Sequence, residues 1–213
     1  MKQFEIFYEL KQPYKTHYND FGDNVDFYKS LNIGLNNGHT GQDSIAIDQT
    51  RPAFTLAIFP IYAGIDGWVY RTEPDNKGGW GVEVISNEKF LDINGQPFFW
   101  KVRYWHILKD GILVKAGQKV RVGDILCWGD NTGLSQKSHC HRDTKPGDVK
   151  GDIFIKAFPD NGWFGAVNDE VYMSKKKDGA YYTAYELRSN LTKISEAIEL
   201  LGRKIAEFIK NRK

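Results

Sequence analysis

The most regular pattern in the chain is Phe98-Phe99-Trp100-Lys101-Val102-Arg103-Tyr104-Trp105-His106-Ile107. Large apolar side chains alternate here with charged ones, as they do in a strand whose two faces meet different surroundings. One face is expected to carry Phe98, Trp100, Val102, Tyr104 and His106, and the other Lys101 and Arg103. The pattern therefore predicts a β-strand that ends in a histidine.

Similar short runs lie on both sides of this strand. Further strands are predicted at residues 44–47, 54–59 and 81–85 and in short pieces between 120 and 127. Hairpin turns are predicted at residues 75–79 and 94–95, which hold the Asn, Asp and Gly residues that tight turns prefer. The predicted fold is mainly β, an antiparallel sheet or sandwich-like domain, followed by a C-terminal amphipathic α-helix.

Length and charge restrict the class of protein. A chain of 213 residues can bury a proper core and is expected to form one main domain. Its net charge of +2 predicts no nucleic-acid partner. The start, Met1-Lys2-Gln3-Phe4-Glu5, holds no apolar signal core, and no apolar run approaches the roughly 18 residues of a membrane span. We therefore expect neither a standard secretion signal nor a transmembrane segment.

Changes of pattern divide the chain into four parts: a lead-in at 1–30, the main domain at 31–150, a loop-rich extension at 151–180 and a helix at 181–213. The last part carries a heptad seam of Ala184, Leu187, Leu191, Ile194, Ile198, Leu201, Ile205 and Phe208. We favour a coiled coil that joins copies of the chain into a homo-oligomer. Packing of this helix on its own domain, or on a membrane surface, are the alternatives.

Four of the five histidines fall in three motifs: Gly38-His39-Thr40-Gly41-Gln42-Asp43, Tyr104-Trp105-His106-Ile107 and Ser138-His139-Cys140-His141. On a strand, residues two apart share a face, so both rings of the last motif are expected to point the same way. A hydrolytic zinc site takes three protein ligands and leaves one position for water. The motifs supply such a set and two spare imidazoles, whereas His17 is interpreted as a surface residue.

Cys127 and Cys140 are the only cysteines. We favour two free, buried thiols over a disulfide, because the spacing does not show that they meet. Cys140 as a zinc ligand is disfavoured, since on a strand it points away from its two histidine neighbours.

Taken together, these motifs resemble the lysostaphin-type zinc metallopeptidases, which cut the peptides of peptidoglycan. That family has Gly-His-x-Gly-x-Asp, Tyr-x-His-Leu, a Gly-Asp/Gln-x-Val-x-x-Gly segment, Gly-x-Thr-Gly and His-Leu-His, in this order. The matching segments here are 38–43, 104–107, 117–123, 130–133 and 139–141, and the resemblance covers residues 31 to 145. The chain departs from the pattern at Cys140, where the family has Leu, and at Arg142-Asp143, where it has apolar residues.

The resemblance implies roles for five residues. It makes His39, Asp43 and His141 the ligands of a Zn²⁺ cofactor and His106 and His139 the catalytic histidines, and it makes residues 31–150 the zinc peptidase domain. One imidazole would take a proton from the attacking water while the other stabilises the oxyanion. We assign the first role to His139 and the second to His106, although the sequence alone leaves the two interchangeable.

The implied function is hydrolysis of peptide cross-links in bacterial peptidoglycan, with those peptides as the substrate. The alternative is a non-catalytic structural or assembly component, for example a virion or tail-associated protein that keeps the fold. All five positions are filled, which favours the enzyme. We expect it to act on the cell wall in a phage-associated or lysis-linked setting, as an endolysin does.

Overall fold

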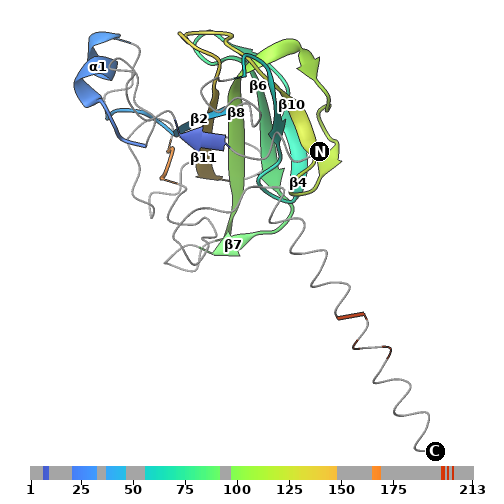
Figure 1. Ribbon diagram of the computed structural model, residues 1–213. Coiled ribbons are helices and arrows are strands. Elements are labelled where there is room, and N and C mark those ends of the chain that lie inside the picture. Colours follow the sequence, from blue (N-terminus) through green and yellow to red (C-terminus); the bar gives the residue numbers. More distant parts are fainter. Residues whose placement is uncertain are drawn as a thin grey trace, which may run out of the picture.

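The computed structural model describes residues 7–9, 21–32, 37–46, 56–91, 97–147 and 165–168, together with residues 198, 199, 201 and 203 (Figure 1). All pairings between the described strands are antiparallel, as the sequence predicts. The mainly β fold class is therefore confirmed for this part of the chain.

The main sheet places strands from distant parts of the sequence side by side (Figure 1). Its order is β1 (Phe7–Glu9), β2 (Gln42–Ala46), β11 (Cys140–Gly147), β8 (Pro97–Ile112), β6 (Gly79–Ser86), β4 (Gly67–Arg71) and β9 (Lys119–Val120). Four strands lie off this path, namely β3 (Phe59–Tyr62), β5 (Pro74–Asp75), β7 (Phe90–Leu91) and β10 (Ile125–Gly129). A short helix, α1 (Val25–Ser30), precedes β2.

The core lies on one face of the central strands. Val82 and Val84 of β6 pack with Val102 and Tyr104 of β8, and Cys140 of β11 joins them. Side chains of β3 and β10 belong to the same cluster, and β10 pairs with β3 and with the C-terminal part of β8. Burial of this apolar surface stabilises the sheet. It also fixes which side chains of β8 and β11 face away from the core.

Strand β8 contains a bulge that the sequence analysis does not predict. Tyr104 pairs with Val82 and Ile107 with Trp80, so three steps along β8 oppose two along β6. His106 takes a left-handed backbone with φ of 62°. The extra residue shifts the alternation, so that Ile107 follows Tyr104 into the core. The expectation that His106 simply continues the face of Tyr104 is therefore wrong.

The other local predictions have mixed outcomes. Strands 81–85 and 98–107 and the hairpin at 75–79 are confirmed, and the last is closed by backbone N–H groups of Lys77 and Gly78 that donate to Asp75. The strand predicted at 54–59 is wrong at residues 57 and 58, which form a bend before β3 begins, and Ile58 is exposed. The turn at 94–95 lies outside the described residues, although the strands on either side of it pair.

Residues 198, 199, 201 and 203 are helical, and Ile198 and Leu201 are exposed. The rest of the predicted helix at 181–213 lies outside the described residues, as does His17. The coiled coil and the four-part division of the chain therefore stay predictions. Within the described residues, no helix has the length and hydropathy needed to cross a membrane.

Candidate metal centre

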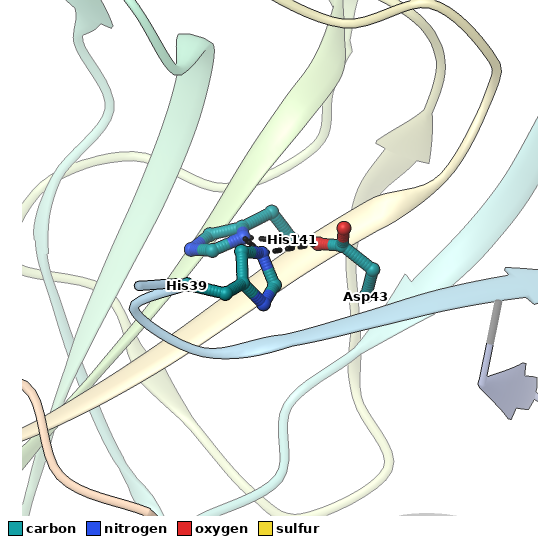
Figure 2. Close-up of side chains that lie close together, drawn as sticks. All are labelled: His39, Asp43 and His141. Carbon is teal, nitrogen blue, oxygen red and sulfur yellow. Dashed lines mark hydrogen bonds and ion pairs between the residues drawn. The ribbon is translucent and has the colours of Figure 1, made fainter. Parts of the chain in front are cut away.

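Two neighbouring strands bring the predicted ligands together. His39 lies on the loop that leads into β2, Asp43 lies on β2, and His141 lies on β11. Asp43 and His141 are directly opposite each other in the β2–β11 pairing, although they are 98 positions apart in the sequence. Figure 2 shows the three side chains pointing toward one point. Since β-sheet register fixes this meeting, the cluster depends on the fold and not on loop conformation alone.

The three donor atoms form a compact triangle. Nε2 of His39 lies 2.9 Å from Nδ1 of His141 and 3.2 Å from Oδ1 of Asp43, and the last two atoms are 3.0 Å apart. Ligands bound tetrahedrally to zinc at about 2.0–2.1 Å are separated by about 3.3 Å. The three residues are 3%, 3% and 8% exposed. Two imidazoles and a carboxylate at this spacing therefore fit one ion (Figure 2).

His39 is held from the N-terminal side by residues that the sequence analysis missed. Its backbone N–H donates to the carbonyl of Asp23, and its carbonyl accepts from the N–H of Gly22. The ring of Tyr28, on α1, stacks on the His39 ring with centroids 5.6 Å apart. No motif marks these residues, because their role depends on tertiary contacts alone.

The two remaining histidines lie beside the triangle. The rings of His106 and His139 have centroids 4.5 Å apart, and Nε2 of His139 is 3.5 Å from Oδ1 of Asp43. Nδ1 of His106 lies 2.7 Å from the carbonyl oxygen of Thr132, and Nδ1 of His139 lies 2.7 Å from that of Lys137. A carbonyl only accepts, so each Nδ1 carries the proton. In a neutral ring this leaves Nε2 as a proton acceptor.

The carbonyl that holds His106 is itself fixed by its own residue. The Thr132 hydroxyl donates to the carbonyl of Ile107, one residue after His106, and accepts from the N–H of Trp80. Gly133 follows with a φ of 78°. Residues 130–133, which the sequence analysis matches to the Gly-x-Thr-Gly segment, thus position the His106 ring of the second histidine motif.

Replacing Gly133 with alanine is expected to destabilise the chain more than the same change at Gly117. Both glycines have a positive φ, at 78° and 81°, which costs a residue with a Cβ about 1–2 kcal/mol. A Cβ at Gly133 would also lie 2.3 Å from the backbone nitrogen of Gly79, whereas one at Gly117 meets nothing within 4 Å. Urea unfolding measures the difference, and equal losses in the two variants would contradict the predicted overlap.

The charges in the cluster follow from burial and from close neighbours. Burial alone would raise the pKa of Asp43, but His39, His139 and a hydrogen bond with His141 hold it well below its usual range. Burial, aided by His139, lowers the pKa of His106 to about 3, and burial also lowers the pKa of His139. At pH 7 these last two rings are therefore neutral.

The pKa of His141, in contrast, is raised. Burial would lower its pKa, but hydrogen bonds with Asp143 and Asp43, and their negative charges, raise it to about 9. In the metal-free chain His141 thus holds a second proton at neutral pH, in the place where an ion would bind.

Both cysteines are free and buried, as predicted. Cys127 of β10 and Cys140 of β11 belong to the apolar core, and Cys140 lies on the face of β11 opposite to that of His141. Burial raises the pKa of Cys140 to about 12, so its thiol stays protonated. This confirms that Cys140 is no part of the candidate centre.

No protein-family model matches the sequence, and no curated protein matches it. Among solved structures, the catalytic domain of the antimicrobial peptidase lysostaphin from Staphylococcus simulans has 20% identity and a TM-score of 0.48, over 73% of this chain and 89% of that chain. A zinc-containing peptidase from Vibrio cholerae has 26% identity and a TM-score of 0.38, over 55% of this chain and 31% of that chain.

The catalytic domain of a prophage-encoded M23 protein, EnpA, from Enterococcus faecalis has 23% identity and a TM-score of 0.43, over 63% of this chain and 82% of that chain. The chain is similar in structure to such peptidase catalytic domains, and it has a buried His-Asp-His cluster that can hold a metal ion.

Proposed function

We propose that the chain is a zinc-dependent endopeptidase that hydrolyses peptide cross-links of bacterial peptidoglycan. The observation that carries the proposal is the triangle of donor atoms from His39, Asp43 and His141, all within 3.2 Å of one another. The motif order supports the substrate class, since it resembles that of peptidases that cut these peptides.

The donor set favours zinc as the ion. Two imidazole nitrogens and one carboxylate oxygen are ligands that zinc accepts, and three protein ligands leave a position for water or substrate. A zinc ion bound there would lower the pKa of water and polarise the scissile carbonyl. The buried carboxylate of Asp43 offsets positive charge in the site, because the neighbouring imidazoles hold its pKa well below the usual range.

His139 is the residue best placed to act as general base. Its Nε2 lies 3.5 Å from Oδ1 of Asp43, so it is adjacent to the donor triangle, and the Lys137 carbonyl fixes the proton on the other nitrogen. A proton accepted at this Nε2 is then available to the departing amine, so that hydrolysis leaves a carboxylate and a free amine.

His106 lies against His139, and its Nδ1–H donates to the Thr132 carbonyl. It can accept a proton at Nε2, and once protonated there it can donate to the oxyanion of the reaction. Either ring can therefore accept first, and the assignment of His139 to this step rests on its closeness to Asp43.

A digest of purified cell walls tests the function. Zinc-loaded chain is expected to release soluble muropeptides with new amino termini, and excess chelator is expected to stop the release until zinc is restored. Mass spectrometry of the products from walls with different cross-links identifies the bond that is cut. Unchanged walls of every type in the presence of zinc would refute the proposal.

The affinity for zinc is expected to rise with pH between pH 6 and pH 8. The pKa of His141 is raised to about 9, so below that value zinc must displace a proton from this ring. Each unit of pH below 9 should then lower the apparent affinity about tenfold, because ligands must be deprotonated to bind. Competition with a chromogenic chelator measures the slope, and equal affinity at pH 6 and pH 8 would argue against His141 as a ligand.

A further inference from the structure

Asp143 is a buried carboxylate beside the candidate metal centre that the proposed reaction does not use. It follows His141 by two positions on β11, so both side chains share a face of the strand. Oδ2 of Asp143 lies 3.5 Å from Nε2 of His141, and the hydroxyl of Thr40 lies 3.1 Å from the same nitrogen. Nε2 is the ring nitrogen that does not belong to the donor triangle.

The carboxylate of Asp143 is fixed by two residues of β8. Nε of Arg103 donates to its Oδ1, and the indole N–H of Trp105 donates to its Oδ2 across 3.1 Å. Strand register places these donors, since Asp143 pairs with Arg103 and His141 with Trp105. Asp143 is only 2% exposed, and its ion pair with Arg103 compensates the negative charge of the buried carboxylate. The group is thus a rigid anion.

A rigid anion next to Nε2 decides how the His141 ring is used. A carboxylate only accepts, so Asp143 keeps the proton on Nε2, and the proton that a bound ion would displace is the one on Nδ1. Nδ1 then points at His39 and Asp43, at 2.9 Å and 3.0 Å from their donor atoms. Such a partner also raises the basicity of the ligand nitrogen.

We propose that Asp143, held by Arg103, is a positioning residue that presents Nδ1 of His141 to the metal ion. The inference rests on the proposed zinc centre, but not on the identity of the substrate. Thr40 shares the task, because its hydroxyl also accepts from Nε2. Asp143 does not contact the reacting atoms, so its expected effect is on the affinity for the metal ion.

The chain offers a matched control in Glu83. This glutamate on β6 is 2% exposed and accepts from Nε of Arg71 at 3.0 Å, so it is also a buried carboxylate paired with an arginine. Glu83 lies opposite Arg103 in the pairing of β6 with β8, and Asp143 lies opposite Arg103 in the pairing of β8 with β11. Glu83→Gln therefore disturbs a similar buried pair in the same sheet, two strands away from His141.

The experiment compares the zinc affinity of the wild-type chain, Asp143→Asn and Glu83→Gln by competition with a chromogenic chelator. Asp143→Asn is expected to bind zinc about 10–100-fold more weakly, the usual cost of losing such a partner. Glu83→Gln is expected to stay within about twofold of wild type. Equal affinity in Asp143→Asn and wild type overturns the proposal, and so do equal losses in the two variants.

Two further measurements test the proposal even if Asp143→Asn does not fold. Arg103→Gln combined with Asp143→Asn removes both charges of the pair, and the same loss of affinity is expected. Long-range ¹H–¹⁵N spectra of the zinc-loaded wild-type chain should show His141 protonated at Nε2 and bound through Nδ1. The reverse pattern, or full affinity in the double variant, overturns the proposal.

Failure of this inference is distinguishable from failure of the proposed function. Zinc binding that weakens in Asp143→Asn, in a chain that cuts no cell wall, refutes the hydrolysis alone. Hydrolysis with undiminished affinity in Asp143→Asn refutes the positioning role alone. A wild-type chain that binds no zinc refutes both.

Discussion

Asp43→Ala is expected to abolish zinc retention and to lower the rate of peptidoglycan hydrolysis by at least about a thousandfold, because a hydrolytic zinc site needs all three protein ligands. Asp43 is the centre of the cluster: its Oδ1 lies within 3.5 Å of nitrogens of His39, His139 and His141. Removing it leaves these imidazoles without the negative charge that balances an ion. Metal analysis after gel filtration, together with the wall digest, measures both effects.

Asp110→Ala is the matched control, since this carboxylate on β8 is exposed. It is expected to keep both the metal and the rate. An Asp43→Ala variant that holds one zinc per chain and digests walls at the wild-type rate would remove Asp43 from the ligand set and with it the proposed centre.

The second large effect is expected from His139→Ala, which should keep zinc and lower turnover by about 10²–10⁴-fold, the usual contribution of a general base. His139 lies next to the donor triangle, but its Nδ1 is bound to the Lys137 carbonyl and its Nε2 is not one of the three ligand atoms. Zinc content and single-turnover hydrolysis separate the two properties in one preparation.

His106→Ala is the informative companion to this variant. Its ring contacts His139 and is fixed by Thr132, so it is also expected to keep zinc and lose turnover. Loss of metal from His106→Ala would show that His106 is a metal ligand and not a catalytic histidine. Full turnover in His139→Ala, with loss only in His106→Ala, would exchange the two catalytic assignments.

The parts of the site that could be predicted are those that follow from spacing within one strand. The two-residue interval between His139 and His141 puts both rings on one face of β11, because side chains alternate along a strand. The meeting of Asp43 with His141 required the register of β2 against β11, which no local pattern contains. It was available only through the resemblance of the motifs to a known family.

Other contacts of the site could not be predicted from any sequence pattern. Tyr28 stacks on His39 from a short helix, and only the tertiary fold places that helix there. The ion pair between Arg103 and Asp143 joins β8 and β11, and no local sequence pattern shows that these two strands are neighbours. The error at residues 57 and 58 has a different cause, because a run of apolar residues does not distinguish a buried strand from an exposed bend.

The bulge in β8 makes the length of this strand as important as its composition. Tyr104 and Ile107 lie three positions apart, which in a regular strand would put them on opposite faces, and both reach the core only because the bulge takes up one residue. Deleting Trp105 would remove the bulge and leave this core pair on one face by simple alternation, but it would also remove the left-handed turn at His106 that brings its ring to His139. Deletion of Trp105 should therefore be as damaging to turnover as loss of the histidine itself, although the core pair keeps its face.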